Sequence, residues 1–178
     1  KPGDVVRFYE INPHVVNIAR TRFHYLGDSA AQIEIALGDA RLSLELEPPQ
    51  RFDVLAIDAF SGDAIPAHLL SAEAMDVYLR HLQPDGAILF HVTNRYLGLG
   101  AVVARIAASR GLLVGLIEHE PTDEEEGLYH SSSDWVVVTR NAALLAHPEV
   151  AKVVKPIEIG ESTPLWTDDF NNLVRVLK

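Results

Sequence analysis

Short apolar runs recur along this 178-residue chain, and segments with helical spacing lie between them. The runs are rich in β-branched residues, as buried strands are. They are Val5–Ile11, Ile33–Leu37, Phe52–Ile57, Ala87–Val92, Leu112–Ile117 and Trp135–Thr139. Strands that alternate with helices form right-handed βαβ units. The sequence therefore predicts a Rossmann-like α/β fold, with a mostly parallel sheet and helices on both faces.

The intervening segments divide into helices, turns and loops. Helical spacing predicts helices over His14–Leu26, Arg41–Glu47, Ala67–Leu82 and Leu97–Arg110. Pro84-Asp85-Gly86 has the composition of a turn. The acidic stretch Glu118–Ser133 is expected to be a solvated loop.

Composition removes several classes of function. The formal net charge of -10 argues against nucleic acid as the main partner, because phosphate binding needs basic surface. The absence of cysteine excludes disulfides, thiolate metal sites and a cysteine nucleophile. The eight histidines show no HxH or HExxH spacing, and no GxSxG is present, so neither a metal enzyme nor a serine hydrolase is expected. No apolar run is long enough to span a bilayer, and we expect a soluble, cytoplasmic domain.

Acidic residues follow three of the predicted strands: Glu10, Asp39 and Asp58. Ligands of an open parallel sheet bind beyond the carboxyl ends of its strands. One acid at a strand end is common, but three in succession would line one rim of the sheet. The sequence therefore predicts a ligand site at this rim, with Glu10 suited to the hydroxyls of a ribose.

Glu10 fits a nucleotide-binding fold only if a glycine-rich loop precedes it. Such an acid follows a G-x-G-x-x-G loop by about 20 residues. This sequence has no such loop, and Gly98-Leu99-Gly100 is in the wrong place. We therefore expect one domain over residues 1–178, truncated at its N-terminus, with the first strand and its loop missing. The alternative is a solvated strand-end acid in another fold.

The two other strand ends each allow a structural explanation as well. Gly38 permits close approach of the backbone to a ligand beside Asp39, but Asp39 could also cap the helix that follows. The segment after Asp58 contains a second carboxylate at Asp63, and paired carboxylates can bind a cationic amine and accept its proton. Asp63 could instead cap the next helix. Farther along, His91 is expected to be a satisfied strand-end residue rather than a ligand.

Segments at these positions resemble the spermidine synthase-like (polyamine aminopropyltransferase) family. They are similar to its bacterial branch, in which this domain follows a membrane transporter-like region. The segments that carry the resemblance are Phe8–Pro13, Gly38–Arg41, Asp58–Pro66 and Thr167–Phe170. The resemblance implies the class I S-adenosylmethionine-dependent methyltransferase fold.

The resemblance also implies roles for the cofactor residues. Glu10 would hold the ribose of decarboxylated S-adenosylmethionine or of its product, methylthioadenosine. Asp39 and the backbone of Ala40 would contact the adenine. Asp58 would border the cofactor as well, so that these four residues form the expected cofactor site.

The remaining expected site residues are those that would contact the amine substrate. Asp58 matches the first aspartate of the family's D-x-x-D loop, whose second aspartate is the usual proton acceptor. Ser61 stands at that second position in this chain, and Asp63 follows two residues later. Asp58 and Asp63 are thus the expected catalytic residues, with Ser61, Asp168 and Asp169 expected to contact a cationic polyamine.

Three functions remain open at this point. The first is aminopropyl transfer, in which an amine attacks the methylene beside the sulfonium and methylthioadenosine leaves. The second is methyl transfer from S-adenosylmethionine to another acceptor. The third is a non-catalytic domain that senses a nucleoside or polyamine. The fragment itself is expected to be inactive and to hold no cofactor.

The missing first strand has a structural consequence. In this fold it lies between the strands that end at Glu10 and Asp58. Those two strands must then pair directly, be joined by another chain, as in a homodimer, or leave a gap. We expect a distorted or partner-completed sheet.

Overall fold

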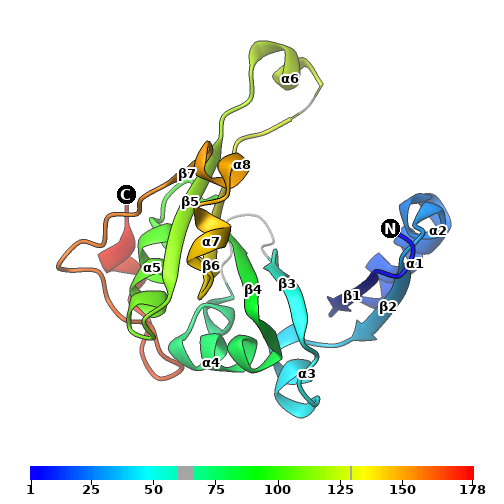
Figure 1. The fold of residues 1–178 in the computed structure, drawn as a ribbon, viewed down its shortest axis with the longest axis horizontal. Coiled ribbons are helices and arrows are strands. Elements are labelled where there is room, and N and C mark those ends of the chain that lie inside the picture. The colour runs from blue at the N-terminus through cyan, green and yellow to red at the C-terminus, as the bar shows by residue number, and fades with distance from the viewer. Residues whose placement is uncertain (60–65, 129) are drawn as a thin grey trace. The chain divides into compact units, whose positions relative to one another are not determined.

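The computed structural model describes residues 1–59, 66–128 and 130–178. The chain divides into two units, Lys1–Pro48 and Pro49–Lys178, and each has its own sheet (Figure 1). Strands β1 and β3, which end beside Glu10 and Asp58, belong to different sheets. The described residues thus form two separate sheets, one in each unit.

The first unit is a two-stranded parallel sheet with three short helices. Its elements are β1 (Val5–Glu10), α1 (Pro13–Arg22), α2 (Tyr25–Asp28), β2 (Gln32–Leu37) and α3 (Ala40–Leu46). The register runs from Val5 opposite Gln32 to Glu10 opposite Leu37. Asn12 caps α1 with its side chain, and Pro13 occupies the first turn, where a missing N–H costs nothing.

A charged network holds the two strands to the end of α3. The Arg7 guanidinium donates to Glu34 at 2.8 Å and also to Glu47, while the Tyr9 hydroxyl donates to Glu47 at 2.7 Å. Burial alone would lower the pKa of Arg7, but the hydrogen bonds to the two carboxylates raise it. Hydrogen bonds to charged groups each contribute about 1.5–3 kcal/mol when they are shielded from water.

Tyr9 should be recognisable in an alkaline titration. Burial and the hydrogen bond to Glu47 raise the pKa of Tyr9 to about 12. Because the ordinary value is about 10, its stabilising effect is present below that pH and is lost as the pH rises towards the folded-state value. We expect Tyr9→Phe to remove a late-ionising component from the tyrosinate absorbance curve. Persistence of that component at unchanged amplitude would show that it belongs to another tyrosine.

The second unit carries a five-stranded sheet. Its elements are β3 (Phe52–Ile57), the 3₁₀ helix η1 (Ala67–Leu69), α4 (Ala72–His81), β4 (Leu82–His91), α5 (Leu99–Ala108), β5 (Leu113–His119), α6 (Asp123–Gly127), β6 (Ser133–Thr139), α7 (Ala142–Leu145), α8 (Pro148–Ala151), β7 (Val154–Lys155) and the 3₁₀ helix η2 (Leu173–Val176).

Strand order in this sheet is β3-β4-β6-β5-β7. β3 and β4 are parallel, whereas β6 runs antiparallel to both of its neighbours, β4 and β5. Helices pack beside the strands, so the predicted α/β class is confirmed (Figure 1). The hairpin of β5 and β6 extends beyond the other strands and carries α6 near its tip (Figure 1).

The turn predicted at Pro84-Asp85-Gly86 is wrong, because these residues lie inside β4. The pairing moves from Phe52 opposite Leu82 to Val54 opposite Ala87, so β4 accommodates the extra residues as an irregularity in the ladder. A Cβ at Gly86 would lie 2.9 Å from the carbonyl oxygen of Asp53. Glycine therefore permits a close approach of the two strands that a larger residue would prevent.

Three predictions for the segments between strands also need correction. The helix expected over His14–Leu26 ends at Arg22 as α1, and α2 follows it as a separate helix. The helix expected over Ala67–Leu82 is divided into η1 and α4, since Ser71 caps α4 by accepting a hydrogen bond from the Ala74 amide. The acidic stretch expected to be a loop contains α6, which a reciprocal capping box between Thr122 and Glu125 begins. The hydrogen bonds from Thr122 lower the pKa of Glu125.

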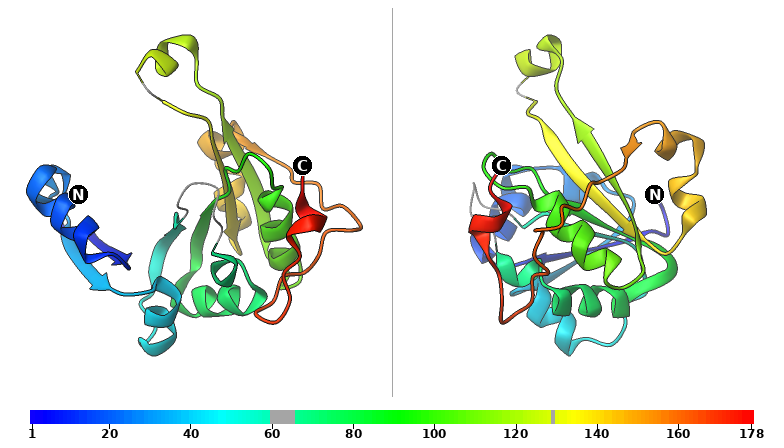
Figure 2. Two further views of the ribbon diagram at one scale, coloured as in Figure 1. Left: turned by 180° about the vertical axis from the view of Figure 1, so that it is seen from behind. Right: turned by 90° about the vertical axis from the view of Figure 1, so that its left-hand side faces the viewer.

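The apolar core lies in the second unit, between the sheet and helices α4 and α5. Its largest fully buried side chains include Trp166, Tyr78 and Phe90. The C-terminal segment joins this core: the Gly98 amide donates to the Val176 carbonyl at 2.7 Å, beside the start of α5 (Figure 2). Among the described residues, no helix has the length and apolar character needed to cross a bilayer.

Candidate functional site

The first unit brings Glu10 and the Gly38-Asp39 turn together at one edge of its sheet. Both follow the carboxyl ends of their parallel strands, and the Gly38 amide donates to the Glu10 carbonyl at 3.0 Å. Gly38 has a φ of +136°, a conformation that residues with a Cβ rarely adopt. The rim predicted for β1 and β2 therefore exists as a local arrangement.

The two acidic side chains of this rim are partly engaged by backbone amides. Glu10 accepts a hydrogen bond from the Asn12 amide through Oε1 at 2.7 Å, which fixes one oxygen of the carboxylate. Asp39 accepts from the Leu42 amide at 2.9 Å and caps α3, as the structural explanation had it. Ala40 is the first residue of α3, directly after this cap.

In the second unit, Asp58 contacts His91, which ends β4 and has polar partners at both ring nitrogens, as predicted for a satisfied strand-end residue. Ile57 and Phe90 are opposite each other in the parallel β3–β4 ladder, and both are buried in the core. The next residue of each strand points to the other face of the sheet. Asp58 and His91 are therefore neighbours on that face, and their Oδ1 and Nδ1 atoms lie 2.7 Å apart.

The pair is extended by Thr93 and Trp135. His91 Nε2 lies 2.7 Å from the Thr93 hydroxyl, and that hydroxyl oxygen accepts from the Asp134 amide at 2.6 Å. His91 is opposite Trp135 in the β4–β6 ladder, and their rings stack with centroids 4.8 Å apart. His91 is 25% exposed and Asp58 is 57% exposed, so the chain of contacts ends on a carboxylate that water reaches.

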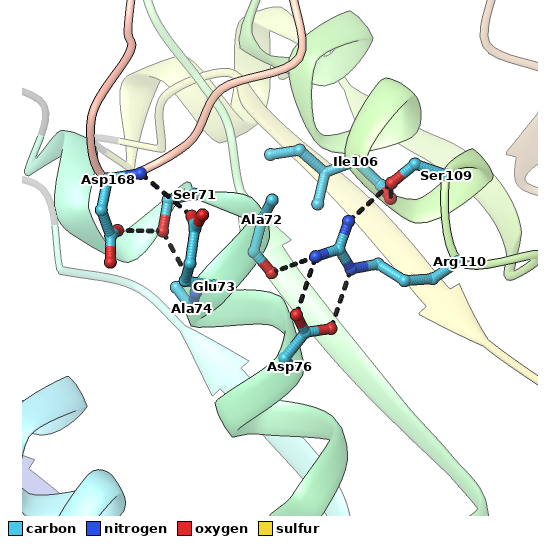
Figure 3. Close-up of polar contacts among 9 residues, drawn as sticks. All are labelled: Ser71, Ala72, Glu73, Ala74, Asp76, Ile106, Ser109, Arg110 and Asp168. Atoms are coloured by element: carbon cyan, nitrogen blue, oxygen red, sulfur yellow. Dashed lines mark hydrogen bonds and ion pairs between the residues drawn. The ribbon is translucent and has the colours of Figure 1, made fainter.

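Asp168 is tied to the beginning of α4. It accepts a hydrogen bond from the Ser71 hydroxyl at 2.6 Å, and its amide donates to the Glu73 carboxylate at 2.9 Å (Figure 3). Two residues earlier, the Trp166 carbonyl accepts from the Ala72 amide. Asp168 thus docks the C-terminal segment, and Asp169 is exposed beside it.

Arg110 reinforces the same helix terminus. Its guanidinium makes two hydrogen bonds to the Asp76 carboxylate, at 2.9 and 2.8 Å, and donates to the Ala72 carbonyl at 2.7 Å (Figure 3). Planar two-point contacts of this kind hold both partners in one orientation. The first turns of α4 are therefore fixed from both the C-terminal segment and the end of α5.

Substitution of Asp168 should destabilise the protein more than substitution of its neighbour Asp169. Asp168→Ala removes the acceptor of the Ser71 hydroxyl, so we expect a loss of about 1 kcal/mol in the free energy of unfolding by urea. Asp169→Ala, the matched control, should change it by less than about 0.5 kcal/mol. Equal effects of the two substitutions would contradict the docking role of Asp168.

Two expected site residues, Ser61 and Asp63, lie outside the described residues. The contact of His91 with Asp58, and the part of Thr93 in it, are what the sequence analysis did not predict. The available signal was that two apolar runs, FDVLAI and AILF, each end at a polar residue, Asp58 and His91. Their contact depends on the strand register, which the sequence alone does not give. Among the described residues, no group of three or more His, Asp or Glu side chains is placed to hold a metal ion.

Searches of protein-family models and of curated proteins found no match to this chain. Solved structures do resemble it. A probable spermidine synthase from Corynebacterium glutamicum ATCC 13032 has 18% identity and a TM-score of 0.54, covering 75% of this chain and 46% of its own. For spermidine synthase from Thermotoga maritima the identity is 16% and the TM-score 0.56, over 92% of this chain and 54% of the other.

Methyltransferases resemble the chain to a similar degree. An O-methyltransferase from Bacillus cereus, solved in complex with SAH, has 17% identity and a TM-score of 0.53, covering 78% of this chain and 64% of its own. The chain spans about half the length of the two spermidine synthases. What these structures share with it is the Rossmann-like fold of the class I S-adenosylmethionine-dependent methyltransferases.

Proposed function

We propose that this chain is the cofactor-binding part of an aminopropyltransferase of the spermidine synthase type. It would take decarboxylated S-adenosylmethionine as donor and a cationic polyamine as acceptor. The observation that carries the proposal is the joined rim of the first unit, where Glu10 and the Gly38-Asp39 turn share one sheet edge. Ligands of α/β sheets bind at this edge.

The rim offers two kinds of contact to a nucleoside. Glu10 Oε2 can accept a hydrogen bond from a ribose hydroxyl while Oε1 remains fixed to the Asn12 amide. Gly38 adopts a positive φ and has no Cβ, so the backbone at this turn can approach a flat ring closely. Asp39 and the Ala40 backbone then border the adenine.

We assign binding and deprotonation of the polyamine's ammonium group to Asp58. Its carboxylate is held by His91 and is accessible to water, so an alkylammonium ion can reach it. Asp58 would take one proton from the ammonium group. The free amine electron pair then forms the nitrogen–carbon bond, the carbon–sulfur bond breaks onto the sulfonium, and methylthioadenosine leaves. Ser61, Asp63, Asp168 and Asp169 are proposed as further contacts of the polyamine.

Methyl transfer is the second candidate, favoured by the O-methyltransferase neighbour with bound SAH. The same Glu10 and Asp39 would serve S-adenosylmethionine, whose extra carboxylate distinguishes it from the decarboxylated donor.

A domain that only senses a nucleoside or polyamine would bind the same ligands without turnover. We further propose that residues 1–178 belong to one cofactor-binding domain, a proposal supported by the alignment of 92% of the chain with a single solved structure. A cytoplasmic location is part of the same proposal.

Calorimetric titration of the full-length protein tests these functions. We expect methylthioadenosine to bind, and Glu10→Gln to weaken it about tenfold or more, because hydrogen bonds to a charged group contribute about 1.5–3 kcal/mol. Glu124→Gln, on the exposed helix α6, is the matched control and should leave affinity unchanged. Product analysis with putrescine and each donor then separates aminopropyl from methyl transfer. No binding of any nucleoside would exclude all the transferase assignments.

A further inference from the structure

Resting on the proposed function, we propose that His91 is a positioning residue for Asp58. Short polar contacts join the Asp134 amide to the Thr93 hydroxyl, that hydroxyl to His91, and His91 to one oxygen of the Asp58 carboxylate. This chain of contacts fixes Oδ1 and presents Oδ2 to the ammonium group of the polyamine. His91 acts through Asp58 and does not itself accept the proton of the amine.

The direction of the chain begins at a backbone amide, which can only donate. The Asp134 amide donates to the Thr93 hydroxyl oxygen at 2.6 Å. The Asp58 carboxylate on the other side of the ring can only accept, so a neutral imidazole that hydrogen-bonds to it is protonated on Nδ1. Nε2, which lies 2.7 Å from the Thr93 hydroxyl, then accepts the single proton of that hydroxyl. The imidazole then carries its own proton on Nδ1, where it donates to Asp58 at 2.7 Å. The Nδ1–H tautomer is thus the one in which every contact of the chain is a hydrogen bond.

Packing fixes the plane of the imidazole as well. Its ring stacks on Trp135 at 4.8 Å between centroids and 20° between planes. The antiparallel register that puts these two residues opposite each other is set by β4 and β6. With its plane and tautomer both fixed, His91 can hold Asp58 in one rotamer although most of that carboxylate is in water.

This arrangement separates the two oxygens of Asp58 by function. Oδ1 is occupied by the imidazole, and the exposed remainder of the carboxylate meets the ligand. A reacting amine must lie within about 3–3.5 Å of its target in the correct line, and a displacement of about 1 Å can cost on the order of a hundredfold in rate. Loss of the His91 donor would therefore raise the KM of the amine and leave the KM of the nucleoside donor unchanged.

The first experiment tests the hydrogen-bond chain without any ligand. Long-range ¹H–¹⁵N spectra of the full chain identify the histidine tautomers, and the His91 signals are assigned by their loss in His91→Asn. We expect the Nδ1–H tautomer when the ring is neutral. Thr93→Val should give a mixture of tautomers, whereas Thr93→Ser should retain the wild-type one. A neutral His91 protonated on Nε2 in the wild-type protein would overturn the proposal.

The second experiment measures the KM of the amine substrate, putrescine, in His91 variants. His91→Phe retains a ring for Trp135 but no donor, and we expect it to raise the putrescine KM at least tenfold with the KM of the nucleoside donor unchanged. His91→Asn, whose amide nitrogen occupies the place of Nδ1, should recover most of this loss. Thermal unfolding by circular dichroism verifies that each variant folds. A folded His91→Phe with the wild-type putrescine KM would refute the positioning role.

The two experiments fail in different ways. A wild-type protein that transfers no aminopropyl group would refute the proposed function, and the substrate part of this inference with it. The spectra would still decide whether the hydrogen-bond chain orients His91 towards Asp58. An active enzyme with the wrong tautomer would instead refute the inference and leave the proposed function standing.

Discussion

Expressed as separate pieces, residues 49–178 are expected to fold cooperatively and residues 1–48 are expected to remain largely unfolded. The reason is where apolar side chains are buried. Of the 27 buried apolar residues in the described chain, all but Ala19 and Leu44 lie in the second unit. Burial of apolar surface is the main driving force of folding, at about 25 cal/mol per Å².

The first unit by itself is held mainly by polar contacts. Its sheet has only two strands, and two-stranded sheets are marginal in water. Its helices are short, from 4 to 10 residues, whereas isolated helices below about 12–15 residues rarely persist. The network of Arg7, Glu34 and Glu47 cannot offset the conformational entropy of ordering the unit, which is about 1–2 kcal/mol per residue.

Circular dichroism and urea titration of the two pieces measure this. The piece covering the second unit should show a single sigmoidal transition, and the first should show a gradual change without a midpoint. The complete chain is the control in both cases. A cooperative transition in residues 1–48 alone would contradict the prediction, since it would require a core that the described side chains do not provide.

Strand positions could be predicted because continuous apolar runs are typical of buried strands. FDVLAI became β3 with the same bounds, and the predicted run over Ala87–Val92 became the last part of β4. The wrong turn at Pro84-Asp85-Gly86 has a non-local cause. Whether such a segment turns or continues in a ladder depends on the partner strand, here on the approach of Asp53 to Gly86.

The candidate site, like the fold, could be predicted only in part. Topology alone places strand-end acids at one edge, and Glu10 and Asp39 do lie together at the edge of β1 and β2. The contact of Asp168 with Ser71 joins residues 97 positions apart, and no local pattern contains it. The contact of His91 with Asp58 was missed for a related reason: it follows from register, which composition and spacing do not specify.

Phe90→Ala should be among the most destabilising single substitutions in the second unit. Phe90 is almost fully buried in the central part of the sheet, with its ring 6.1 Å from that of Tyr78. Large-to-small changes at such positions cost about 3–5 kcal/mol, from lost transfer free energy and from the cavity that remains. We expect a decrease in Tm of roughly 10 °C, at about 2–4 °C per kcal/mol for a chain of this size.

Thermal and urea unfolding of three variants would decide this. Leu128→Ala is the control for loss of apolar surface at an exposed position, since Leu128 is 66% exposed, and it should change stability by no more than about 0.5 kcal/mol. Phe90→Leu keeps much of the buried volume and should fall between the two. A loss below about 1 kcal/mol for Phe90→Ala would mean that β4 is not part of the core.

The position of Phe90 also links stability to the site. Phe90 and His91 are consecutive in β4, so one side chain packs into the core while the next, on the opposite face, holds Asp58. Removing the phenylalanine ring loosens the packing of β4, the strand whose register with β3 places His91 beside Asp58. Phe90→Ala should therefore broaden or shift the His91 signals in the same spectra that assign its tautomer, whereas Leu128→Ala should leave them in place.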